Sequence, residues 1–180
     1  IRPDFLCLSK GLTAGYLPLG ATLTTDEIYQ AFYADYKEKK TFFHGHTFTA
    51  NPLACAAALA SLEIFEEEDV MERVRKILPF FHKSIDEFKD LPLVGDVRYL
   101  GLIGGLELVK DKKSKQGFGP EERIGFKIYR QALKRNLVLR PLGDIIYFFL
   151  PLCIQRKELR DILDRAYSLI RSFSKTSLHF

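Results

Sequence analysis

The stretch that decides the fold of this chain is Asp4-Phe5-Leu6-Cys7-Leu8-Ser9-Lys10-Gly11-Leu12-Thr13-Ala14-Gly15. Its apolar first part, bounded by Pro3 and Gly11, predicts a buried β-strand. Lys10 follows this strand where a loop rich in glycine begins. Ligands of open α/β sheets bind at the carboxyl ends of strands, and a partly desolvated lysine is a nucleophile toward carbonyl groups. Two explanations of Lys10 therefore remain open, a catalytic amine and a surface lysine that ends a strand.

The composition is that of an ordinary globular protein. The 180 residues are 47% hydrophobic and 28% charged, with a net charge of +4, which argues against disorder. The basic cluster from Lys110 to Lys115 has no aromatic residues among its lysines, so we expect a solvated loop and no nucleic-acid partner. The longest apolar run, 145–154, is interrupted by Pro151 and is too short to cross a bilayer, so we expect no membrane partner.

The cysteines indicate the cellular compartment of the protein, and the start of the sequence indicates whether residues precede it. Cys7, Cys55 and Cys153 lie in apolar surroundings, and an odd number without paired spacing predicts buried, reduced thiols in a cytoplasmic protein. No signal peptide opens the sequence. The sequence begins at Ile1, directly before a predicted core strand, although chain termini are normally exposed. We therefore expect that the N-terminal part of a longer protein precedes these residues.

The remaining sequence predicts two segments that divide at residues 68/69. Residues 1–68 predict an α/β piece that ends in an apolar helix capped by Asn51, with Pro52 in its first turn. That helix is apolar on nearly all sides, so we expect it to be buried on most of them. Residues 69–180 predict a smaller α+β domain. We expect strands at 21–23, 94–109 (two strands), 137–141 and 145–150, and helices at 26–33 (capped by Thr24), 53–65, 70–88, 121–134 and 157–173.

The segment from His44 to Asn51 allows two kinds of ligand. His44 and His46 could bind a metal, but no third ligand stands at a suitable spacing, so we expect none. A hydroxyl at Thr47 and free backbone N–H groups before the helix would suit a phosphate. A turn followed by a helix cap explains the same residues without any ligand.

Arg140 ends an apolar strand, where an unpaired guanidinium is costly. A substrate carboxylate is a suitable bidentate partner, whereas composition alone favours an ion pair within the chain. Tyr147, on the facing strand, could line the same pocket or fill the core.

Taken together, these segments resemble the class III, pyridoxal-phosphate-dependent aminotransferases. The resemblance covers nearly the whole chain and rests on the segments Pro3–Thr13, His44–Ala58, Gly15–Thr25 and Leu139–Tyr147. It implies the C-terminal part of a fold type I aminotransferase: residues 1–68 end the large α/β cofactor domain, and residues 69–180 form the small α+β domain. It also implies a homodimer with shared active sites.

The resemblance further implies a role for each residue of the site. Lys10 would attach pyridoxal 5'-phosphate and act as the catalytic base. Thr47 would bind the cofactor phosphate across the dimer interface. His46 and Gly45 would lie in the adjoining loop, where His46 would contact the cofactor and Gly45 the substrate. Arg140 would bind the substrate carboxylate, with Tyr147 in the same pocket.

Within the class, the resemblance implies the biotin-synthesis reaction that converts 8-amino-7-oxononanoate to 7,8-diaminononanoate. S-adenosylmethionine is the expected amino donor, with lysine as an alternative donor. An aminotransferase for ornithine or 4-aminobutyrate, and a non-catalytic binding or dimerisation fragment, are the competing hypotheses. The family's glycine-serine phosphate loop, ring-stacking aromatic residue and pyridine-facing aspartate have no counterpart in these residues, so we expect the isolated 180-residue chain to be inactive.

Overall fold

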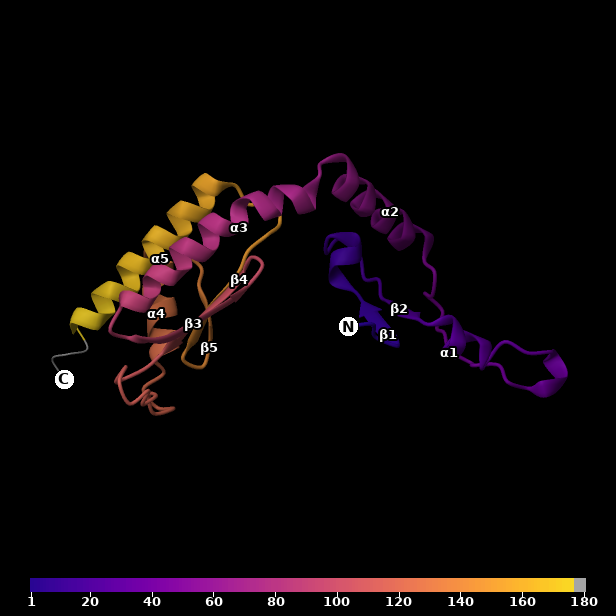
Figure 1. The fold of residues 1–180 in the computed structure, drawn as a ribbon, viewed down its shortest axis with the longest axis horizontal. Helices are drawn as coiled ribbons and strands as arrows, with labels where there is room; N and C mark the ends of the chain where they lie inside the picture. Colours follow the sequence, from indigo (N-terminus) through magenta and orange to yellow (C-terminus); the bar gives the residue numbers. More distant parts are fainter. Residues whose placement is uncertain (177–180) are drawn as a thin grey trace. The chain divides into compact units, whose positions relative to one another are not determined.

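The fold is known from a computed structural model, which describes the backbone of residues 1–176 and the side chains of residues 1–173. Its contacts divide the chain into two compact units, the first from Ile1 to Val70 and the second beginning at Met71. The helices and strands, in chain order, are β1 (Phe5–Leu8), η1 (Lys10–Thr13), β2 (Ala21–Thr24), α1 (Asp26–Gln30), η2 (Tyr36–Glu38), α2 (Pro52–Glu67), α3 (Val70–Asp86), η3 (Glu87–Asp90), β3 (Val94–Leu100), β4 (Ile103–Leu108), α4 (Ile124–Leu133), β5 (Arg140–Leu142), β6 (Ile145–Phe149) and α5 (Arg156–Thr176) (Figure 1).

The first unit is built on a two-stranded antiparallel sheet of β1 and β2. Phe5 pairs with Thr24 and Leu8 with Ala21. The strand predicted before Lys10 is confirmed, but its predicted burial is wrong, because Phe5 remains 58% exposed. Among the residues that the structure describes, no second layer covers this sheet.

Helix α1 begins at Asp26, as predicted, but it is shorter than predicted and its N-cap lies one residue later than expected. Thr24 belongs to β2, where its hydroxyl donates a hydrogen bond to the Asp4 carbonyl, so it is not the cap. Thr25 occupies the N-cap position with an extended backbone and makes no capping hydrogen bond. A helix without this bond lacks one source of stability at its start, and α1 ends at Gln30.

Helix α2 confirms one prediction and contradicts another. The Asn51 side chain accepts hydrogen bonds from the amides of Leu53 and Ala54, and Pro52 occupies the first turn, as predicted. The predicted burial on most sides is wrong: Leu53 and Leu59 are 72% and 62% exposed, because only one narrow stripe packs against the rest of the unit. That stripe consists of Ala54, Ala58 and Ser61.

The prediction for the cysteines is confirmed in one respect and wrong in another. All three are free, as expected, but Cys7 and Cys153 are exposed and Cys55 is only half-buried. Apolar neighbours in sequence did not predict burial, because the strand and the loop that carry Cys7 and Cys153 lie at the surface. Within residues 1–176, no helix is both long enough and apolar enough to cross a membrane.

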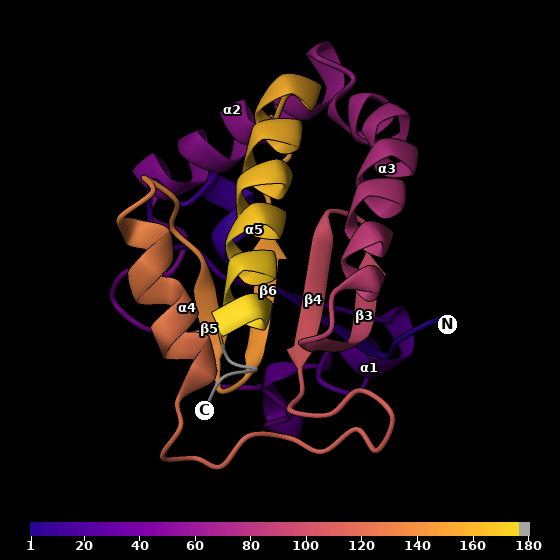
Figure 2. The same ribbon diagram turned by 90° about the vertical axis from the view of Figure 1, so that its left-hand side faces the viewer.

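The second unit is a four-stranded antiparallel sheet in the order β3-β4-β6-β5. Helices α3, α4 and α5 cover one face of it (Figure 2). Helix α3 passes through Pro79 without ending. It is followed by the short 3-10 turn η3, so the predicted helix 70–88 is confirmed apart from its last residues.

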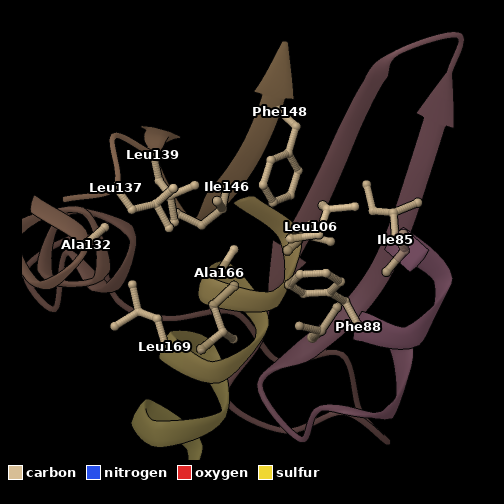
Figure 3. Packing of buried hydrophobic residues seen from close by; sticks show 14 of the residues in the cluster. Ile85, Phe88, Leu106, Ala132, Leu137, Leu139, Ile146, Phe148, Ala166 and Leu169 are labelled. Atoms are coloured by element: carbon tan, nitrogen blue, oxygen red, sulfur yellow. The ribbon is translucent and has the colours of Figure 1, made fainter. Parts of the chain in front are cut away.

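The core of the second unit lies between this sheet and its helices. Fully buried side chains from both layers meet there, and Phe88 contacts Phe148 edge to face (Figure 3). Ile85 lies so close to β4 that a Cβ atom on Gly104 would overlap it, which explains a glycine in the middle of that strand. The labelled core residues are Ile85, Phe88, Leu106, Ala132, Leu137, Leu139, Ile146, Phe148, Ala166 and Leu169.

A polar network lies at the end of α3. The Asp86 carboxylate pairs with the Lys89 ammonium group at 2.5 Å and accepts a hydrogen bond from the Tyr99 hydroxyl at 3.1 Å. The His82 ring stacks on the Tyr99 ring. The hydrogen bond from Lys89, aided by that from Tyr99, lowers the pKa of Asp86 below its ordinary value.

We predict that truncating Phe88 to alanine destabilises the second unit. Phe88 is fully buried and contacts both sheet and helix, so its loss should lower the free energy of unfolding by about 3–5 kcal/mol. Urea unfolding of the full natural protein measures this change. Leu100→Ala is the control, because Leu100 is 81% exposed. An equal loss in both variants would contradict the assignment of Phe88 to the core.

We also predict that the stability of the second unit depends on pH because of the Asp86 carboxyl group. A carboxyl group with a lowered pKa in the folded state stabilises the protein above its unfolded-state pKa, and this stability is lost as the pH falls through the folded-state pKa. Asp86→Asn should therefore reduce the loss of stability on acidification, and Tyr99→Phe should reduce it by a smaller amount. Unfolding curves between neutral and strongly acidic pH test this order. Unchanged pH dependence in Asp86→Asn would rule out the role of this network.

Candidate active site

Lys10 stands immediately after β1, at the first residue of the 3-10 turn η1. Its backbone has a positive φ of 27°, and its carbonyl accepts a hydrogen bond from the Gly15 amide at 3.0 Å. Its side chain is exposed and has no hydrogen bond or ion pair with any described residue. The expected position at a strand end is therefore observed. The expected partial desolvation is not, because β1 itself lies at the surface.

Two hydroxyl groups hold the loop that begins at Lys10. The Thr13 hydroxyl donates to the Leu17 carbonyl at 2.5 Å and accepts from the Leu17 amide at 3.3 Å. The Ser9 hydroxyl donates to the Leu19 carbonyl at 3.0 Å. Thr13 is only 2% exposed, so its hydrogen bonds are shielded from water. These bonds fix the backbone on both sides of Lys10 and leave its amine free.

The segment from His44 to Asn51 forms a tight turn before α2. The Thr49 hydroxyl accepts from the His46 amide at 2.9 Å, and Nδ1 of His46 accepts from the Phe48 amide at 3.2 Å. The Thr49 amide donates to the His46 carbonyl at 2.9 Å. Ala50 adopts a left-handed conformation with φ of 56°, which turns the chain toward the Asn51 cap.

This turn leaves a set of donors unused. In the part of the chain with described side chains, the amides of Gly45, Thr47 and Ala50 and the Thr47 hydroxyl donate no hydrogen bond. Such a set can hold an oxyanion. A metal is less suitable here, because Nδ1 of His46 already accepts a hydrogen bond, and residues 1–173 contain no cluster of three metal-ligating side chains.

A hollow of about 780 Å³ lies between this turn and the loop after β1. Its lining includes Ser9, the loop from Leu17 to Gly20, His44, His46 and the first residues of α2. Of the site residues predicted from the sequence, only His46 lines it; Lys10, Gly45 and Thr47 do not. Ser9, Phe48 and Asn51 also line the hollow, and no sequence signal marks them for this role, since it depends on two loops folding against each other.

Arg140 and Tyr147 lie together in the second unit. They are directly paired across β5 and β6, and the Arg140 guanidinium carbon lies 5.9 Å from the centre of the Tyr147 ring. No carboxylate with a described side chain pairs with Arg140, so the ion pair considered from the sequence is not observed. The exposed guanidinium thus keeps its donors for an external carboxylate.

Comparisons with known proteins bear on the whole chain. The family model for aminotransferase class III matches residues 1–170. An adenosylmethionine-8-amino-7-oxononanoate aminotransferase of Aquifex aeolicus is 46% identical over 97% of this chain and 39% of its own length. The crystal structure of the enzyme of that name from Methanocaldococcus jannaschii is 46% identical, with a TM-score of 0.91 over 95% of this chain and 39% of its own. The PMP-bound form of an aminotransferase from Vibrio fluvialis is 27% identical, with a TM-score of 0.91 over 98% of this chain and 39% of its own. The chain thus spans about two fifths of the length of these relatives.

We predict that Asn51→Ala loosens the start of α2. The variant removes the acceptor of the Leu53 and Ala54 amides, at a cost of about 1 kcal/mol in the stability of the helix. Hydrogen exchange of these two amides should become faster, whereas Asn51→Asp, which keeps an acceptor oxygen, should leave it near the native rate. Equal exchange in the alanine variant and the native protein would contradict the capping role.

Proposed function

Because the chain belongs to the aminotransferase class III family, we propose that the protein containing it is a pyridoxal-phosphate-dependent aminotransferase. Its substrate is 8-amino-7-oxononanoate, which it converts to 7,8-diaminononanoate in biotin synthesis, with S-adenosylmethionine as amino donor. The observation that carries the proposal is the 46% identity, over nearly the whole chain, to an adenosylmethionine-8-amino-7-oxononanoate aminotransferase of Aquifex aeolicus. The bound cofactor supplies the electron sink that amino-group transfer requires.

Lys10 is the proposed attachment point of the cofactor and the base of the reaction. Its amine is exposed at the end of β1 and unpaired among the described side chains, while the hydrogen bonds of Ser9 and Thr13 fix the backbone that carries it. The Lys10 amine would hold the cofactor, and once freed from it the same amine would serve as the general base that accepts and returns the substrate proton.

The turn around Thr47 is the proposed holder of the cofactor phosphate. Its chemistry fits this group, since the Thr47 hydroxyl and the amides of Gly45 and Thr47 are donors without a partner in the described part of the chain. Lys10 does not line the hollow beside this turn, which is consistent with the two serving different cofactor molecules. We therefore propose a homodimer in which Thr47 of one subunit contacts the cofactor attached to the other, with His46 and Gly45 beside it.

Arg140 and Tyr147 are the proposed site for the carboxylate of 8-amino-7-oxononanoate. The guanidinium lies near the Tyr147 ring and has no carboxylate partner of its own among residues 1–173, which supports a role in bidentate recognition. We also propose a cytoplasmic location, which the three free cysteines support.

The decisive experiment is to locate the cofactor on the full natural protein. Borohydride reduction in the presence of pyridoxal phosphate, followed by peptide mapping, should label Lys10. Lys10→Ala should lose the label and reduce turnover by about 10²–10⁴-fold or more, because both cofactor attachment and proton transfer are lost. Lys134→Ala, which changes an exposed lysine at the C-cap of α4, serves as the control. Label on another lysine, or none, would favour a non-catalytic role.

A second experiment tests the substrate. Arg140→Gln should raise KM for 8-amino-7-oxononanoate by about 10–100-fold, the effect of losing a charged hydrogen-bonded contact. Turnover with S-adenosylmethionine, lysine, ornithine and 4-aminobutyrate as donors then identifies the amine. Transamination of ornithine or 4-aminobutyrate, without activity toward 8-amino-7-oxononanoate, would assign the protein to another reaction of the same family.

A further inference from the structure

A groove of about 580 Å³ lies between α3 and α5 of the second unit. The two helices run side by side in the same direction, as both views of the ribbon show (Figures 1 and 2). Residues from one face of each helix line the groove. None of the residues assigned above to the aminotransferase site contributes to it.

An aromatic ring orders two arginines in this groove. The guanidinium carbons of Arg156 and Arg160 lie 4.6 Å and 5.1 Å from the centre of the Phe80 ring. Phe80 is half-buried and packs against the core of the unit, so the ring itself is held in place. Cation–π contact with one fixed ring restricts both guanidinium groups. Donors restricted in this way lose less conformational freedom when they bind an anion.

The groove also has a surplus of positive charge. Four cations, Lys76, Lys83, Arg156 and Arg160, line it against two carboxylates. Arg156, Arg160 and Lys83 form no ion pair with any described side chain, and Lys76 reaches Glu72 only at 3.9 Å. The cations repel one another, so an oxyanion placed among them is stabilised.

The charges are distributed unevenly along the groove. The helices run the same way, and on each side the cations come before the carboxylate: Glu87 begins η3 directly after α3, and Asp164 lies on α5. Both carboxylates therefore lie toward one end. A long polyanion lying along the groove would pass them and be repelled, whereas a compact anion at the basic end would not.

We propose that this groove is a binding site for a small, multiply charged oxyanion, bearing phosphate or carboxylate groups. Arg156 and Arg160 provide the forked hydrogen bonds, and Lys76 and Lys83 add charge at its sides. The proposal is independent of the aminotransferase assignment, because the two use different residues.

Isothermal titration calorimetry tests the proposal on the full natural protein. The protein is first saturated with pyridoxal phosphate, so that a cofactor phosphate site cannot contribute, and is titrated at low salt with pyrophosphate or citrate. We expect saturable binding of one anion per chain. Arg156→Gln combined with Arg160→Gln should weaken it by about tenfold or more. Arg156→Lys with Arg160→Lys, which keeps the charge but loses the fork, should weaken it less. Tighter binding of pyrophosphate than of citrate identifies phosphate as the recognised group, and the reverse order identifies carboxylate.

A matched control separates this site from general attraction by surface charge. Arg130→Gln combined with Lys134→Gln removes the same charge from an exposed position on α4 and from its exposed C-cap. Both positions lie outside the groove, so the affinity should change by no more than about twofold. Absence of saturable binding to the native protein would overturn the proposal. So would an equal loss in the control and groove variants, or unchanged binding in both arginine double variants.

Discussion

One buried hydroxyl group holds the backbone on which the proposed chemistry depends. Thr13 both donates to and accepts from the Leu17 backbone, and it is shielded from water, so the loop after β1 closes on itself. Lys10 stands at the start of this loop with its side chain outside it. A lysine in an unconstrained loop would sample many positions, whereas this one projects from a backbone that is fixed on both sides.

The two units differ in how much of their apolar surface they bury. In the second unit, a sheet and three helices bury one continuous core, with Phe88 and Ile146 near its centre. In the first unit, a single stripe of α2 packs closely, and large apolar side chains such as Phe5 and Leu53 remain exposed. Apolar surface of this extent is typical of contacts with other protein. It is consistent with the proposed homodimer, in which residues of this unit serve the active site of a second subunit.

The sequence was a good guide to local structure and a poorer guide to burial. The Asn51 cap, the strand before Lys10 and three of the four strands of the second unit followed from periodicity and capping chemistry, which are local properties. The strand expected at 137–141 was misplaced, because it runs from Arg140 to Leu142. The exposure of β1 and α2 did not follow from the sequence, because burial depends on which surfaces contact each other in the folded protein. The direct pairing of Arg140 with Tyr147 is a matter of strand register, and a pattern on one strand does not specify its partner. The hollow beside His46 was missed for the same reason, since it forms between loops far apart in sequence.

The open apolar face of α2 has a consequence for these 180 residues if they are produced alone. No described residue covers this face, so it would be available for nonspecific association. The second unit, which buries its own core, is free of this hazard. In such a product, aggregation should therefore begin at the first unit.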